Sequence, residues 1–189
     1  MALGIEEVKV GCWTDDENAT GVTVILPPAG SLGAIAVRGG APGTREAAAL
    51  GPTGSGEECH AVVLCGNSVF GLAAADGVAE WCVENDRGLE LASALVPVVA
   101  AAVVFDITGP NNPRPGPNAG RLACEAATTS DPSCGRVGVG RGCTVGKAAG
   151  RGYASPGGQG ISVVQLSLIH ISEPTRPRLI SYAVFCLKK

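Results

Sequence analysis

Short apolar runs separated by turn-forming residues open the chain. Residues 8–13, 21–26 and 32–37 are rich in valine, isoleucine and leucine, with a polar TDDENA turn at 14–19 and Pro-Pro-Ala-Gly at 27–30. β-branched runs bounded by such turn signals are typical of strands that follow one another in a sheet. The pattern therefore predicts an antiparallel meander of three strands.

A further apolar run, residues 61–64, leads into the sequence GNSVFGLAAADGV at 66–78. Apolar residues then recur every three or four positions, which predicts a helix over 68–85 with Ser68 as its N-cap. Glycine inside a helix is about 1 kcal/mol less favourable than alanine. The glycines of this stretch, including Gly77, therefore indicate that another backbone packs very close to the helix.

Residues 95–107 are almost continuously apolar, too uniform for a strand with one solvated face. They predict either one strand buried on both faces or two short strands that meet at Pro97. A rigid loop at 111–117 and a second helix at 118–128 follow. The run 161–165 predicts one more strand, so the chain is expected to mix strands and helices.

Composition indicates a globular domain with a core of small side chains. Of 189 residues, 46% are hydrophobic and only 4% aromatic, and 28 are glycine, so burial relies on closely packed aliphatic side chains. The net charge of −3 argues against a nucleic-acid surface. No apolar run reaches the roughly 18 residues of a membrane span and no signal peptide opens the chain, so we expect a cytoplasmic protein. The cysteines form no C-x-x-C pair, which argues against a zinc site, and Cys65 and Cys82 are expected to be buried free thiols.

Two glycine-rich segments carry candidate binding chemistry. Arg38 opens RGGAPGT, which fits either a substrate-facing loop or a structural turn. Lys147 closes GCTVGK and is either a surface lysine or a donor to an oxyanion. Spacing excludes a phosphate-binding loop, because Arg141 and Ala148 stand where that motif needs Gly and Ser or Thr. A dinucleotide fingerprint and a lipase-type G-x-S-x-G around Ser68 fail on spacing as well.

The last segment, residues 166–189, reads LSLIHISEPTRPRLISYAVFCLKK. Codons for LSLIHISEPTR and ISYAVFCL reproduce the two ends of a common DNA-sequencing adaptor, with an index tag between them and a poly-A run encoding the final lysines. We interpret the segment as translated adaptor, which leaves residues 1–165 as the N-terminal part of a single domain. Without the tail the chain has 10 Lys and Arg against 16 Asp and Glu, a net charge of −6, and one histidine, His60.

Five motifs stand in the order found in one enzyme family. They are RGGAPGT at 38–44, GNSVFGLAAADGV at 66–78, VPVVAAAVVFD at 96–106, NAGRLACEAA at 118–127 and GCTVGK at 142–147. Over residues 5–165 the chain thereby resembles the L-aminopeptidase/D-esterase family, which includes β-peptidyl aminopeptidases and endo-type 6-aminohexanoate (nylon-oligomer) hydrolases. The resemblance implies an α/β fold of the four-layer α-β-β-α sandwich type, incomplete in this chain, and a site that uses no metal and no cofactor.

The resemblance also implies a mechanism and its residues. Family members cut their own chain and expose a Ser or Thr, whose hydroxyl attacks the substrate and whose α-amino group can serve as the base. Lys147 matches an active-site lysine of the nylon-oligomer hydrolases. Phe105 stands where some members have a tyrosine that helps to hold the oxyanion, a bond that phenylalanine cannot donate. Asn67 and Ser68 are implied to line the site, with Arg38 as the candidate at its rim.

We therefore expect a fragment of a self-processing N-terminal-nucleophile hydrolase that acts on peptides or amide oligomers. The family's nucleophile lies beyond the point where the adaptor begins, so the chain itself is expected to be inactive. The parent protein is expected to form a homo-oligomer, without nucleic-acid or membrane partners. Two alternatives stay open: a non-catalytic binding or assembly domain, and an acyltransferase built on the same sandwich.

Overall fold

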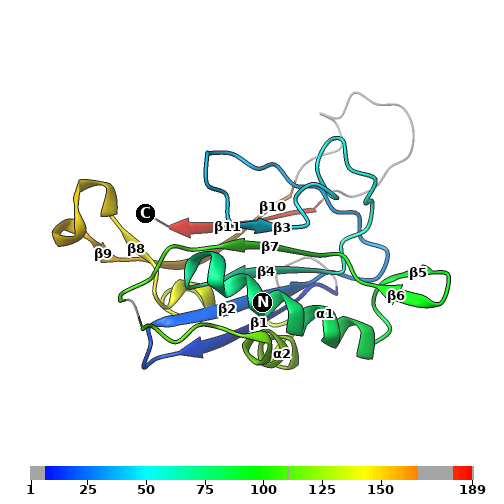
Figure 1. The fold of residues 1–189 in the computed structure, drawn as a ribbon, viewed down its shortest axis with the longest axis horizontal. Helices are drawn as coiled ribbons and strands as arrows, with labels where there is room; N and C mark the ends of the chain where they lie inside the picture. Colours follow the sequence, from blue (N-terminus) through cyan, green and yellow to red (C-terminus); the bar gives the residue numbers. More distant parts are fainter. Residues whose placement is uncertain (1–6, 110, 166–180, 189) are drawn as a thin grey trace.

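The computed structural model describes residues 7–109, 111–165 and 181–188, and a five-stranded sheet lies at its centre (Figure 1). The strands are β1 (Lys9–Asp15), β2 (Thr20–Leu26), β3 (Thr44–Arg45), β4 (Ala61–Cys65) and β7 (Val99–Val103). Their order in the sheet is β1-β2-β4-β7-β3. Only β4 and β7 pair in parallel, and the other neighbouring strands are antiparallel.

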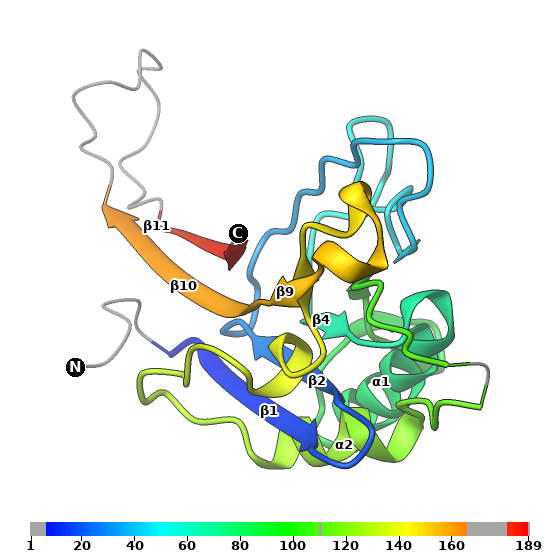
Figure 2. The same ribbon diagram turned by 90° about the vertical axis from the view of Figure 1, so that its left-hand side faces the viewer.

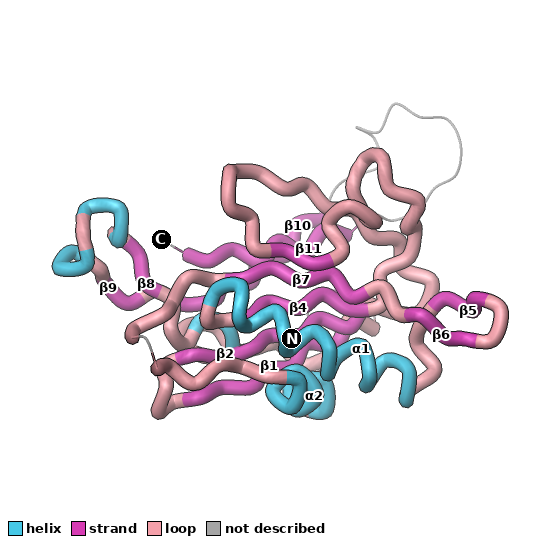
Figure 3. Tube along the Cα trace, in the orientation of Figure 1, coloured by secondary structure: helices cyan, strands magenta, loops and turns pink. Residues whose placement is uncertain are grey.

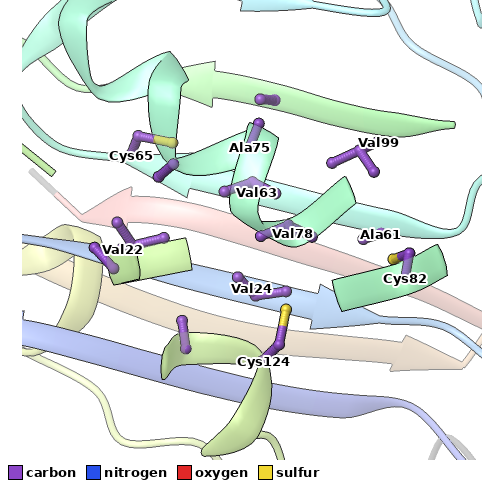
Figure 4. Close-up of a cluster of buried hydrophobic side chains, with 14 of the residues drawn as sticks. Val22, Val24, Ala61, Val63, Cys65, Ala75, Val78, Cys82, Val99 and Cys124 are labelled. Carbon is purple, nitrogen blue, oxygen red and sulfur yellow. The ribbon is translucent and has the colours of Figure 1, made fainter. Parts of the chain in front are cut away.

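Two helices, α1 (Ala74–Glu84) and α2 (Pro117–Glu125), cover one face of this sheet (Figure 2). Val24, Val63 and Val78 point into the layer between sheet and helices and are fully buried (Figure 4). Cys65 and Cys82 belong to the same core and are free thiols, as predicted. Burial raises the pKa of the Cys65 thiol to about 12, so this cysteine is an inert core residue.

The two helices touch backbone to backbone through glycine. A Cβ atom at Gly77 of α1 would overlap the carbonyl oxygen of Pro117, and one at Gly120 of α2 would overlap the carbonyl oxygen of Ala74. The predicted close backbone approach is therefore confirmed. Its partner is the neighbouring helix.

The predicted helix over 68–85 is present, but its first part has a different form. A 3₁₀ segment, η1 (Ser68–Ala73), precedes α1, and both Asn67 and Ser68 adopt left-handed backbone angles, with φ of 66° and 55°. The prediction of Ser68 as a side-chain N-cap is wrong, since no side-chain cap bond forms at either helix start. The tight left-handed turn instead directs the Ser68 N–H to the Val104 carbonyl oxygen, 2.9 Å away.

The predicted third strand of the meander does not form. Residues 32–37 follow Pro27 and Pro28 in a largely exposed loop, and β4 takes the place beside β2 (Figure 3). Proline has no N–H to continue a ladder, so the chain leaves the sheet after Leu26. Of the two alternatives for 95–107, the pair of short strands is confirmed, because β6 (Ala94–Val96) and β7 are separated at Pro97.

A second β layer begins on the sheet face opposite the helices. There β10 (Gly158–Gln165) pairs antiparallel with β11 (Ser181–Lys188), the only described part of the segment interpreted as adaptor. Gln159 fixes β10 to the central sheet, because its side chain accepts a 2.7 Å hydrogen bond from the Thr23 hydroxyl and donates one of 2.7 Å to the Ser133 carbonyl oxygen. The described layers therefore run helices, sheet, second sheet.

Shorter elements complete the chain. They are β5 (Leu89–Leu91), which pairs with β6, then η2 (Gly138–Gly140), β8 (Thr144–Val145), η3 (Lys147–Ala149), η4 (Arg151–Tyr153) and β9 (Ser155–Pro156). Within the described ranges, no helix has the length and apolar character needed to cross a membrane.

Candidate active site

A cleft of about 470 Å³ opens where the chain leaves β7. One wall is the segment that directly follows this strand, and the other is the glycine-rich stretch around η3. The lining residues are Phe105, Asp106, Ile107, Thr108, Gly142, Thr144, Lys147 and Ala154. Two of the residues singled out in the sequence, Lys147 and Phe105, therefore meet in one cleft although 42 positions separate them.

Lys147 extends from the wall around η3 toward the segment that follows β7, which holds its ammonium group. Its Nζ donates a hydrogen bond to the Phe105 carbonyl oxygen and lies 5.7 Å from the centroid of the Phe105 ring. Gly146, with φ of 80°, makes the turn that brings the lysine to this position. An ammonium group has three N–H donors, so Lys147 can bind the Phe105 carbonyl and still offer donors to a ligand in the cleft.

Asp106 is the functional candidate that the sequence analysis did not single out. Asp106 is buried, with a residue exposure of 4%. The carboxylate accepts a 3.1 Å hydrogen bond from the Thr20 hydroxyl and another from the Asn67 backbone N–H. Burial raises the pKa of the Asp106 carboxyl, while these two hydrogen bonds and the charge of Lys147 act to lower it. A single charged residue near the end of an apolar run was the available signal.

Asn67 and Ser68 form the turn behind this wall. Asn67 is buried, and its side-chain amide donates a 3.0 Å hydrogen bond to the Pro113 carbonyl oxygen. Neither residue is among those that line the cleft; Asn67 is joined to it through Asp106, and Ser68 is bonded to Val104. Arg38 lies on an exposed loop between β2 and β3, and it too is absent from the cleft lining.

The described residues hold no cluster of three or more His, Cys, Asp or Glu side chains with the geometry of a metal site. The chemistry that the cleft itself offers is hydrogen-bond donation from an ammonium group beside hydroxyl and apolar side chains. Such a site suits a ligand that carries a carbonyl or other acceptor oxygen on an apolar chain.

Two relatives by sequence each cover more than two thirds of this chain. An uncharacterized aminopeptidase of Mycobacterium tuberculosis is 48% identical over 133 residues, which is 70% of this chain and 38% of that protein. A 6-aminohexanoate-oligomer endohydrolase of Paenarthrobacter ureafaciens is 33% identical over 141 residues, 74% of this chain and 37% of that protein. The chain thus spans less than two fifths of the length of these curated relatives.

Solved structures agree on the fold. The L-aminopeptidase D-Ala-esterase/amidase of Ochrobactrum anthropi, described as a variant of the Ntn hydrolase fold, superposes with a TM-score of 0.65 at 20% identity, over 87% of this chain and 48% of that one. A β-aminopeptidase of a Burkholderia species gives a TM-score of 0.59 at 19% identity, over 88% and 47%.

The α/β fold class and the family resemblance expected from the motifs are thereby confirmed. Residues 3–164 match the sequence pattern of one peptidase family, and this range holds every residue of the cleft. The chain belongs to Peptidase family S58.

Proposed function

We propose that residues 1–165 are the N-terminal part of a self-processing amide hydrolase that acts on peptides or amide oligomers. The observation that carries the proposal is the position of Lys147, the residue matched to an active-site lysine by resemblance, in a cleft beside Phe105. The relatives support the same reaction class, since they are an aminopeptidase and an endohydrolase of 6-aminohexanoate oligomers.

In the proposed mechanism Lys147 acts on the oxygen of the scissile carbonyl. Its ammonium donors lie at the cleft, so they would stabilise the negative charge that develops when the carbonyl is attacked. Phe105 cannot supply the hydroxyl that some family members place there, so we assign the role of oxyanion donor to Lys147 on the opposite wall. The attacking group would be a Ser or Thr made N-terminal by self-cleavage, with its α-amino group as the base.

We place that nucleophile in the part of the relatives' length that this chain does not span. The chain as printed would then have no nucleophile and no cleavage site, and residues 166–189 would be adaptor-derived sequence. We also propose that the parent protein is cytoplasmic and forms a homo-oligomer. The residues that line the cleft do not distinguish α-peptides, β-peptides and amide oligomers as substrates.

The chain as printed tests the first half of this proposal. After expression, mass spectrometry should find one intact polypeptide, and assays with amino-acid amides and 6-aminohexanoate oligomers should show no hydrolysis. A pair of processed subunits, or turnover of either substrate, would contradict the assignment of the nucleophile.

A fusion protein tests the second half. Residues 1–165 are joined to the part of the M. tuberculosis relative that follows its aligned region, and self-cleavage and hydrolysis are measured. We expect the fusion to be processed and active, and Lys147→Ala to lower kcat by about 10²-fold, the effect of removing one oxyanion donor. Lys9→Ala, a distant exposed lysine, is the control. Transfer of the acyl group to an added amine in preference to water would support the acyltransferase alternative instead.

A further inference from the structure

We propose that Asp106 is a positioning residue, whose buried carboxylate fixes the segment after β7 so that the Phe105 carbonyl holds the Lys147 ammonium at the cleft. The consequence for catalysis rests on the proposed function, because it requires Lys147 to act in the reaction. The geometric part stands on the contacts of this chain alone.

The carboxylate joins two segments that are remote in the sequence. One oxygen accepts the Thr20 hydroxyl at the start of β2, over a separation of 86 residues, and the other accepts the backbone N–H of Asn67, over 39 residues. Both bonds are buried. A carboxylate held from two directions in this way cannot rotate without leaving a buried donor unpaired.

The space around the carboxylate is shaped by two glycines. A Cβ atom at Gly66 would lie 2.7 Å from Asp106 Oδ2, and one at Gly142 would lie 2.9 Å from Asp106 Cβ. Both distances are shorter than a non-bonded contact allows. Gly142 belongs to the same glycine-rich stretch as Lys147, and Gly66 begins the turn after β4. The room for Asp106 is therefore built jointly by that turn and by the cleft wall that carries Lys147.

The hydrogen bond to Asn67 also holds an unfavourable turn. Asn67 and Ser68 are consecutive non-glycine residues with left-handed backbone angles, a conformation that side chains disfavour. Such a turn persists when surrounding bonds fix it, and the Asp106 carboxylate and the Val104 carbonyl take the two successive N–H groups.

Asp106 reaches Lys147 through the peptide bond that it shares with Phe105. The oxygen of that peptide unit is the acceptor for the lysine ammonium. With Asp106 anchored, this carbonyl keeps one direction, and the lysine is held at the wall of the cleft. With the anchor removed, the carbonyl can turn, and the lysine loses its fixed acceptor.

The chain itself allows a direct test, because it contains only four lysines, at positions 9, 147, 188 and 189. In protein labelled with ¹³C and ¹⁵N at lysine, Lys147→Met identifies the Lys147 side-chain signal. We expect this signal to be distinct from those of exposed lysines. Asp106→Asn and Asp106→Ala should shift it toward theirs and speed ammonium hydrogen exchange by roughly five- to tenfold, the factor for loss of one hydrogen bond.

Two further variants make the result decisive. Asp76→Asn removes an exposed carboxylate that pairs with Arg45, and it should leave the Lys147 signal unchanged. Thr20→Val removes one anchor of Asp106 while keeping the side-chain shape, and it should give a smaller shift of the same sign. If the Asp106 variants do not fold, Thr20→Val decides alone. An unchanged Lys147 signal in any folded Asp106 or Thr20 variant overturns the proposal.

The catalytic consequence is tested in the fusion protein by combining variants. If Asp106 acts through Lys147, Asp106→Asn should lower kcat with little change in KM, and adding it to Lys147→Ala should cause no further loss. Losses that multiply would show a separate structural role and overturn the catalytic part. If the unmodified fusion is inactive, the proposed function fails, whereas the lysine spectrum still decides the positioning.

Discussion

Replacing Gly77 by alanine tests whether the contact between the two helices limits the fold. An alanine inside an exposed helix is normally about 1 kcal/mol more favourable than glycine. At Gly77, however, the added Cβ would overlap the Pro117 carbonyl oxygen and lie 2.9 Å from Pro117 Cα. Both are backbone atoms, so no side chain can rotate away, and α1 and α2 must move apart.

The magnitude follows from the two opposing effects. Inserting a methyl group into a tightly packed core costs about 1–3 kcal/mol, which outweighs the gain in helix propensity. The overlap is with backbone atoms that cannot rotate away, which places the cost at about 2–3 kcal/mol. After subtracting the gain of about 1 kcal/mol in helix propensity, we expect Gly77→Ala to lower the free energy of unfolding by about 1–2 kcal/mol. In urea, with a slope of about 2 kcal/mol per molar, the midpoint should fall by about 0.5–1 M at unchanged slope.

Gly152 provides the matched control. A Cβ at this position meets no atom within 4 Å, and its backbone is outside the left-handed region. Gly152→Ala should leave the midpoint unchanged or raise it slightly, by restricting the unfolded chain. A Gly77→Ala protein with a midpoint at or above that of the unmodified chain would refute the reasoning, because the helices would then have room to spare.

Three other outcomes can be checked. His60 Nδ1 accepts a 3.0 Å hydrogen bond from the Val98 N–H, and burial lowers the pKa of the His60 ring. The contribution of neutral His60 to stability should be fully present above the ordinary histidine pKa of about 6.5 and be lost as pH falls through the lower pKa of the folded state. His60→Asn should flatten this part of the profile of urea midpoint against pH. Thr23→Val should cost about 1–3 kcal/mol in urea unfolding, because Gln159 Oε1 and the Val139 N–H both lose the Thr23 hydroxyl, and a smaller loss would mean that water replaces it. Resequencing the source gene past codon 165 should give a frame that differs from residues 166–189, and an identical frame would contradict the adaptor interpretation.

The sequence predicted those features whose cause is local. The sequence pattern predicted both helices, and Pro97 predicted the division of the long apolar run. Gly77 in α1 indicated a close contact with another backbone. The failure at 32–37 has a local cause as well, since Pro27 and Pro28 remove two donors directly after β2 and the chain leaves the sheet there. Apolar composition alone could not distinguish this exposed loop from a strand.

Of the residues that line the cleft, only some of those within recognised family motifs could be predicted from the sequence. Lys147 and Phe105 were singled out through family resemblance, and the fold brings them together in one cleft. Asp106 was missed because nothing near it in the sequence reveals its partners, which come from the start of β2 and from the turn before η1. Likewise, the sequence indicated that another backbone packs against Gly77, but it could not show that this backbone belongs to α2.

The parallel pairing of β4 with β7 has a consequence for the order of assembly. Parallel strands need a crossover, and here α1 and the β5–β6 hairpin lie between the two strands, so we expect their alignment to form late in folding. Asp106 reaches Thr20 and Asn67 only after that alignment. The amide hydrogen of Asn67, which is bonded to the Asp106 carboxylate, should therefore exchange with solvent only when this part of the sheet opens.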